Sequence, residues 1–371
     1  MREREYGKYL QKCNLLPVEP APVPSGVRCV AVIPACDELG TIGRTLESLR
    51  VPDDCAVLVV VNHPAEAAPR VKEASAGLLC QLRRGALVCR NLHWIYAPDL
   101  HGGVGEARKL GMDAAVASQK AELLEHLILA SLDADTVVEA DYFPAILNAF
   151  GHEPRPEALS IPFRHLPGET PDEERAIRQY EGYLERYVAK LREAGSPYAF
   201  QTVGSAFAVR FDAYIRAGGM RIRKGGEDFY FLQAVAKNGV VAVGDKVLVH
   251  PSARPSARVP FGTGPAVRKL MAGEKLSEIS DEAFGALGQL LSLAQDPELL
   301  NDTELFLAQM DSCCSDFLRS EGFSDVWPKV LANTPKRTDA RIAAFHRWFD
   351  GLRTLRCLHT FDRKAASGSE N

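Results

Sequence analysis

The sequence predicts an α/β protein with a mostly parallel sheet flanked by helices, followed by a helical C-terminal region. From about residue 27, short unbroken apolar runs alternate with segments of helical periodicity, and strand patterns disappear after about residue 265. Unbroken apolar strands are typical of a parallel sheet that helices cover on both faces. We therefore expect an N-terminal extension (1–26), an α/β domain (27–265) and a helical C-terminal region (266–371).

The elements of the α/β domain are expected in alternation. The predicted strands are residues 27–35, 55–64, 92–99 and 126–135, and the predicted helices between them are 39–50, 69–84 and 105–119. The helical assignments rest on apolar spacing such as that of Ile42, Leu46 and Leu49. Farther along we expect a long amphipathic helix (170–197), an extended segment (199–210) and a short helix that Gly239 ends.

Composition excludes several classes of protein. The net charge is −4, with 46% hydrophobic residues, so no overall basic field indicates a nucleic-acid partner. The nine cysteines include no C-x-x-C pair, which favours reduced buried thiols over a disulfide or zinc framework. No signal-peptide core and no run of the ~18 apolar residues needed for a membrane span is found. These features predict a cytoplasmic protein without a transmembrane segment.

Asp133 and Asp135 follow the fourth predicted strand, one residue apart. In open α/β sheets ligands bind outside the carboxyl ends of the strands, where these two side chains are expected to lie. They can share one cation, or one can hold a ribose while the other holds the metal. Hard oxygen ligands suit Mg²⁺ or Mn²⁺. The alternative is that Asp133 ends the strand and Asp135 caps the following turn.

Several motifs accompany this Asp-x-Asp pair in a fixed order. They are "PACDE" with Pro34 and Glu38, "EARK", "LDAD", "VGSAFAVR", "AGGM" and "GGEDFYFL". In this order, over roughly residues 27–265, the chain resembles the GT-A glycosyltransferases, especially those of the family 2 type. The resemblance implies transfer of a sugar from a nucleoside-diphosphate donor, UDP or GDP, to a hydroxyl acceptor, with Mn²⁺ or Mg²⁺ as cofactor.

The resemblance also implies roles on the donor side. Pro34, Ala35 and Glu38 would embrace the nucleoside, with Glu38 toward the ribose or base. Asp135 would hold the metal and Asp133 the nucleotide or the metal. Two further donor-side positions are Asn62, where the family usually has Asp, and Arg108, which would steady the diphosphate unless it lies on a solvated helix face.

On the acceptor side the resemblance implies a general base in "GEDF". Asp228 is the expected base and Glu227 the second choice for an inverting reaction. The alternative is that both are helix N-terminal carboxylates favoured by the helix dipole.

"VLVHPSARPSAR" departs most from the family pattern. His250 leaves a strand where some GT-A enzymes, notably retaining ones, have a third metal ligand, so a retaining reaction stays an alternative. Arg254 and Arg258 carry guanidinium groups suited to phosphate oxygens. They are candidates to clamp the donor diphosphate or an acidic acceptor, or they lie on the surface without such a role.

Other classes of protein compete with this interpretation. "DADTV" also satisfies the motif of haloacid-dehalogenase-like phosphatases, in which Asp133 would be the nucleophile, but the required later G-D-x-x-x-D is missing. "GGVGEARK" is not the G-x-G-x-x-G of a nicotinamide-binding domain, and "PACDELGTIG" lacks the glycine-rich opening of a sugar nucleotidyltransferase. A non-catalytic nucleotide-sugar-binding protein is the remaining alternative.

Overall fold

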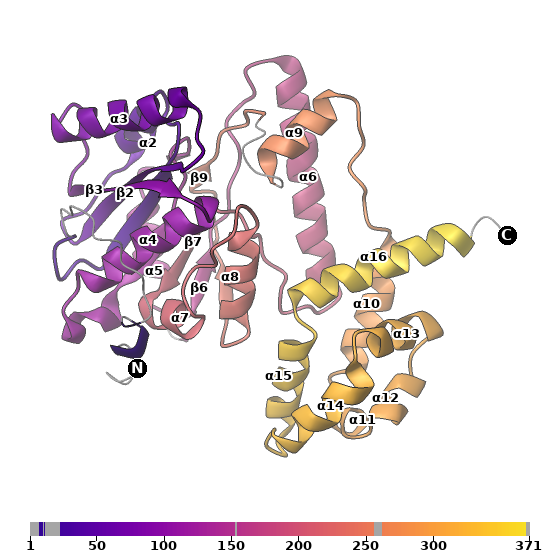
Figure 1. Cartoon of the computed structure of the whole chain (residues 1–371). Coiled ribbons are helices and arrows are strands. Elements are labelled where there is room, and N and C mark those ends of the chain that lie inside the picture. The colour runs from indigo at the N-terminus through magenta and orange to yellow at the C-terminus, as the bar shows by residue number, and fades with distance from the viewer. Residues whose placement is uncertain (1–6, 10, 12–22, 153, 256–261, 369–371) are drawn as a thin grey trace. The chain divides into compact units, whose positions relative to one another are not determined.

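The computed structural model describes residues 7–9, 11, 23–152, 154–255 and 262–368. The chain divides into two compact units (Figure 1). Unit 1 comprises residues 1–180 and 200–274, and unit 2 comprises residues 181–199 and 275–371. The strands found in the described residues belong to unit 1, and the division falls within the long helix α6 (Pro171–Glu193).

A seven-stranded sheet forms the centre of unit 1. Its strand order is β3-β2-β1-β4-β7-β6-β8, and the first four strands in this order are mutually parallel. These are β3 (Leu92–Leu100), β2 (Cys55–Pro64), β1 (Cys29–Ala35) and β4 (Ile128–Ser131). Every residue of β1 is buried, as expected of an unbroken apolar strand with a neighbour on each side.

The far half of the sheet is mixed. β7 (Phe207–Arg210) runs antiparallel between β4 and β6 (Ala158–Ser160), and β8 (Val241–Val243) pairs parallel with β6. A second, two-stranded sheet pairs β5 (Val137–Val138) with β9 (Val249–His250). The predicted mostly parallel sheet is therefore confirmed, with β7 antiparallel to both of its neighbours.

Helices cover both faces of the sheet (Figure 1). One face packs against α2 (Ile42–Ser48), α3 (Pro69–Arg83) and α5 (Tyr142–Ala149) in a single apolar core. The other face packs against α4 (Gly103–Ala117), which contacts the first four strands of the sheet order. Further helices of unit 1 are a 3₁₀-helix (Ala121–His126), α7 (Phe211–Arg216), α8 (Glu227–Ala236) and α9 (Thr263–Met271).

The close packing of α4 on the sheet depends on Gly111. A Cβ atom at this position would lie 2.4 Å from Cγ1 of Val32 and 2.7 Å from Cγ2 of Val60. Both distances are far below van der Waals contact, so only glycine lets the helix lie this near to β1 and β2. This approach also fixes the position of Arg108, one turn earlier on the same helix.

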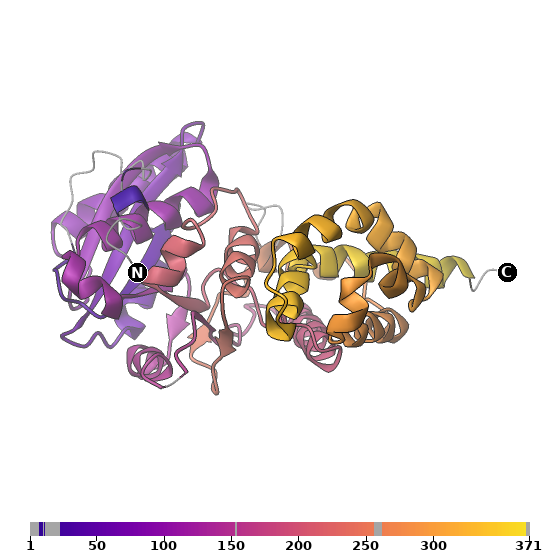
Figure 2. The same ribbon diagram turned by 90° about the horizontal axis from the view of Figure 1, so that it is seen from below.

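In its described residues, unit 2 contains helices and no strand (Figure 2). They are α10 (Asp281–Leu293), α11 (Pro297–Asn301), α12 (Thr303–Ala308), α13 (Ser312–Ser320), α14 (Phe323–Ala332), α15 (Thr338–Trp348) and α16 (Gly351–Gly368), together with the end of α6. Side chains of Asp296, Asp302 and Asp311 accept hydrogen bonds from backbone N–H groups and cap α11, α12 and α13. The core is aromatic: the rings of Phe323 and Trp327 stack 5.4 Å apart. The predicted helical C-terminal region is confirmed.

No helix in the described part of the chain is long and apolar enough to cross a membrane. All the cysteines that the structure describes are free, and Cys29, Cys55, Cys314 and Cys357 are buried.

Candidate active site

The predicted site residues meet where the strand order reverses. From β1 the chain continues to β2 and β3 on one side, whereas β4 pairs with the other side of β1. Such a switch leaves a crevice outside the carboxyl ends of the two central strands. Glu38 follows β1, and Asp133 and Asp135 follow β4, so all three residues lie at the carboxyl ends of these two strands.

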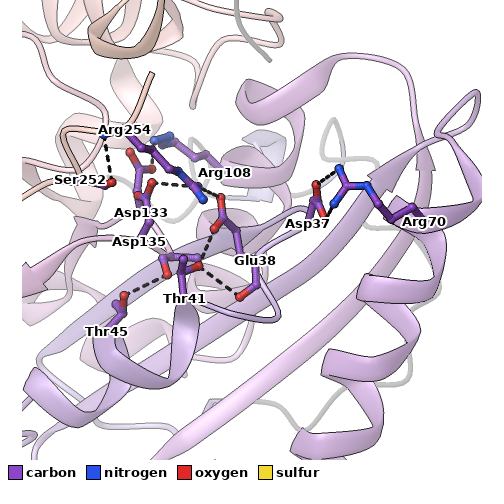
Figure 3. Close-up of polar contacts among 11 residues, drawn as sticks. Asp37, Glu38, Thr41, Thr45, Arg70, Arg108, Asp133, Asp135, Ser252 and Arg254 are labelled. Carbon is purple, nitrogen blue, oxygen red and sulfur yellow. Dashed lines mark hydrogen bonds and ion pairs between the residues drawn. The ribbon is translucent and has the colours of Figure 1, made fainter. Parts of the chain in front are cut away.

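Arg254 joins two of these carboxylates (Figure 3). Its Nη2 pairs with Oε1 of Glu38 and lies 2.9 Å from Oδ2 of Asp135. The Glu38 side chain is only 7% exposed, and its other oxygen accepts a hydrogen bond from the Thr41 hydroxyl. The segment after β9 therefore places a cation between the loop after β1 and the loop after β4.

Local hydrogen bonds hold the loop after β4. Thr45 donates through Oγ1 to the carbonyl of Ala134 at 2.9 Å, which ties the loop to α2. The amide of Thr136 donates to the carbonyl of Asp133 at 3.2 Å and closes a turn. The backbone of Asp133 therefore takes part in a turn just after β4, while its carboxylate pairs with Arg108 (Figure 3).

Arg108 is the buried centre of the site. The residue is 2% exposed, and its Nη2 pairs with Oδ1 of Asp133. Its Nη1 donates to Oε1 of Glu227 at 3.2 Å, and its Nε donates to Oγ of Ser131 at 3.1 Å. Burial alone would lower the pKa of Arg108, but Asp133, Glu227 and Asp228 together raise it. Arg108 thus does not lie on a solvated helix face; it connects the carboxylates of Asp133 and Glu227.

Sequence reasoning did not identify the two residues that hold Arg108 in place. Ser131 donates to the carbonyl of Gly204 at 2.6 Å while it accepts the hydrogen bond from Arg108. A Cβ atom at Gly204 would lie 2.5 Å from Nη2 of Arg108, so the guanidinium requires glycine there. The only sequence signal was the glycine of "VGSAF" just before a strand.

Glu227 and Asp228 open helix α8. Gly226 precedes them with a φ of 70°, a left-handed conformation that glycine adopts without strain. Glu227 is 4% exposed, and burial raises the pKa of its carboxyl although Arg108 opposes the shift. Burial and the charge of Glu227 raise the pKa of Asp228 to about 7. The side chain of Asp228 accepts a hydrogen bond from the Phe229 amide at 2.7 Å.

The other donor-side candidates lie at the ends of the strands. Pro34 and Ala35 are buried in β1, where they pair with Val60 and Val61. Asn62 is buried at the end of β2, and its Nδ2 donates to the carbonyl of Val60 at 2.9 Å. The neighbouring His63 contacts the Tyr96 hydroxyl through Nε2 at 3.4 Å.

His250, the candidate third metal ligand, already has partners on both ring nitrogens. Nε2 lies 2.9 Å from Oε1 of Glu139, and Nδ1 lies 2.9 Å from the carbonyl of Arg164. To bind a metal, His250 would have to give up one of these contacts. Arg258, the other candidate on this segment, lies outside the described residues.

The donor set permits a hard divalent cation. Asp133 and Asp135 supply carboxylate oxygens, and Mg²⁺ or Mn²⁺ needs few protein ligands when water and a diphosphate complete its shell. The described residues contain no cluster of three His, Cys, Asp or Glu side chains with metal-binding geometry. Instead, an arginine pairs with each aspartate. A bound cation would therefore share the Asp135 carboxylate with Arg254, or it would displace the Arg254 guanidinium from that carboxylate.

The chain is similar to solved structures of glycosyltransferases. No protein-family model and no curated protein matches its sequence. The structure of TarS residues 1–349 from S. aureus, in complex with UDP-GlcNAc, is 15% identical; the match covers 86% of this chain and 90% of that one, with a TM-score of 0.44. The mannosyltransferase PcManGT from Pyrobaculum calidifontis, in complex with GDP-Man and Mn²⁺, is 17% identical, with 93% of each chain covered and a TM-score of 0.41.

Proposed function

We propose that the protein is a metal-dependent glycosyltransferase that moves a sugar from a UDP or GDP donor to a hydroxyl acceptor. The observation that carries the proposal is the buried Arg108, which contacts Asp133 at one end of the site and Glu227 at the other. An inverting transferase has to bring a leaving group and an attacking group to opposite sides of one carbon atom. Two carboxylate groups connected through one rigid cation meet this need.

The donor end would bind the nucleoside diphosphate. Glu38, 7% exposed and held by Thr41 and Arg254, would accept a hydrogen bond from a ribose hydroxyl. When bound, Mn²⁺ or Mg²⁺ would be held by Asp135 and Asp133 and would stabilise the charge of the departing diphosphate. Arg254 would turn from Asp135 toward the phosphate oxygens, which its guanidinium suits.

The acceptor end would remove the proton from the attacking hydroxyl. Asp228 has a pKa raised to about 7 by burial and by Glu227, and such a carboxylate is a stronger base than an ordinary aspartate. Glu227 is engaged by Arg108, so Asp228 is the general base in this proposal and the reaction is inverting. A retaining reaction with His250 as a metal ligand would first require the loss of its contact with Glu139 or Arg164.

Release of nucleoside diphosphate tests the proposal. Wild-type protein with Mn²⁺ is offered a panel of UDP- and GDP-sugars, and Asp135→Ala is expected to lower turnover by about 100-fold or more because one metal ligand is lost. Asp54→Ala is the matched control. Asp54 directly precedes β2, at the amino ends of the parallel strands and away from the proposed site, and in the described residues its ion pair is with Arg28. Wild-type protein that releases no nucleoside diphosphate from any donor would disprove the proposal.

A further inference from the structure

Residues 221–224, which precede Glu227 and Asp228, form an exposed segment with three cationic side chains. Arg221, Ile222, Arg223 and Lys224, called here the basic loop, all have exposed side chains. None of the three cations forms an ion pair with a carboxylate in the described part of the chain. In contrast, Arg210 and Arg216 on the preceding elements both pair with Asp212. The chain has a net charge of −4, so these unpaired cations are a local feature of its surface.

The backbone of the basic loop is seated tightly on the start of α4. The amide of Gly105 donates to the carbonyl of Arg223 at 3.1 Å. A Cβ atom at Gly105 would lie 2.3 Å from the carbonyl oxygen of Arg221, and one at Gly103 would lie 2.9 Å from Cα of Lys224. The glycines of "GGVG" therefore serve close backbone contact here. These contacts fix the backbone from which the side chains of the basic loop project.

The basic loop lies next to the acceptor end of the site. Arg108 follows Gly105 by one helical turn on α4, and Glu227 follows Lys224 after two glycines. The Arg223 guanidinium stacks over the ring of Tyr230, 3.8 Å from its centroid, which fixes the direction of this side chain. Because a stacked guanidinium keeps its edge N–H groups available, it can still donate to an oxyanion.

We propose that the basic loop binds a phosphate group of the acceptor. This inference rests on the proposed function and adds the chemical class of the acceptor to it: a hydroxyl compound that carries phosphate near the reacting oxygen. Guanidinium groups bind phosphate oxygens through paired hydrogen bonds, and an ammonium group adds a point charge. Three cations on four residues can neutralise one or two phosphate groups. A nucleic acid would instead call for an extended basic face, and the basic loop is only four residues long.

Binding of a fluorescent polyphosphate chain to the full-length protein tests the inference. The triple variant Arg221→Gln, Arg223→Gln, Lys224→Gln is compared with wild type by fluorescence anisotropy. A matched control, Arg44→Gln, Lys72→Gln, Arg84→Gln, removes the same charge from exposed positions on helices α2 and α3 and just after α3. The basic-loop variant is expected to bind at least about tenfold more weakly, whereas the control binds like wild type.

Two outcomes would overturn the inference: wild type that does not bind polyphosphate, or equal weakening in both triple variants. A labelled polyglutamate chain is measured in parallel, and tighter binding of this chain would overturn the assignment to phosphate. Release of nucleoside diphosphate with water as acceptor is measured in the same proteins. Turnover without polyphosphate binding refutes only the acceptor assignment, whereas the absence of turnover with every donor refutes the proposed function.

Discussion

At the level of single residues, Arg108 determines the electrostatics of the site. It is buried and contacts both Asp133 and Glu227, so its positive charge offsets part of the cost of holding several carboxylates close together. The pKa of Asp228 still rises to about 7, because burial and the charge of Glu227 outweigh the effect of Arg108. The protonation state of Asp228, the proposed base, therefore depends on the charge of Glu227.

The pH dependence of turnover follows from this arrangement. Activity of the wild type is expected to rise with pH through about 7 as Asp228 loses its proton. In Glu227→Gln a negative neighbour is removed, so the pKa of Asp228 falls and the rise moves to lower pH. The measurement is kcat/KM against pH for both proteins. A profile that keeps its midpoint in the variant would contradict the role assigned to this pair.

Some contacts of the site follow from the sequence motifs, and others could not be predicted from them. The pattern of motifs led to Asp133, Asp135, Arg108 and the acidic pair, and the structure brings Arg108 into contact with Asp133 and Glu227. The pairing of Glu38 with Arg254 could not be predicted, because 216 residues separate them and no periodicity reports so distant a contact. Whether these residues perform catalysis stays a prediction.

At the level of elements, the position of α4 is set by its contact with the sheet. Gly111→Ala would place a Cβ atom 2.4 Å from Val32, so the helix has to move away from β1. We expect the variant to lose about 1–3 kcal/mol of stability, as is usual for overpacking, although alanine favours a helix. Urea unfolding monitored by circular dichroism measures the change.

A matched glycine provides the control for this variant. Gly182 lies within α6, and a Cβ atom there would meet nothing within 4 Å. Gly182→Ala is therefore expected to stabilise the protein by up to about 1 kcal/mol, through helix propensity alone. Destabilisation of equal size in both variants would show that the contact with Val32 is not the cause.

The elements differ in how well the sequence predicts them. β1 and β2 are long apolar runs, and their burial between two helical layers is already implied by their composition. β6 has three residues, and β5 and β9 have two each, too few for any periodicity to be visible. The antiparallel insertion of β7 between β4 and β6 is a matter of long-range pairing, which local sequence patterns do not encode.

At the level of the whole molecule, the division into two units predicts which part of the chain a bound nucleotide protects. All the proposed site residues that the structure describes belong to unit 1. Addition of UDP or GDP with Mn²⁺ is therefore expected to increase the protection of amides in unit 1 against hydrogen exchange, particularly in the loops after β1 and β4. Hydrogen exchange measured by mass spectrometry provides the test, with Asp135→Ala as the control. Protection confined to the helices of unit 2 would place the nucleotide site elsewhere.

The pairing of Arg254 with Glu38 and Asp135 has a consequence for folding. The strands β1 to β4 come from the first 131 residues, but the cation at their carboxyl ends arrives only with residue 254. A chain emerging from the ribosome can therefore assemble this half of the sheet long before Arg254 is available to pair with Glu38 and Asp135. Contacts between such distant positions form late because closing a long loop costs entropy. Until then, the carboxylates of Glu38 and Asp135 remain without this shared partner.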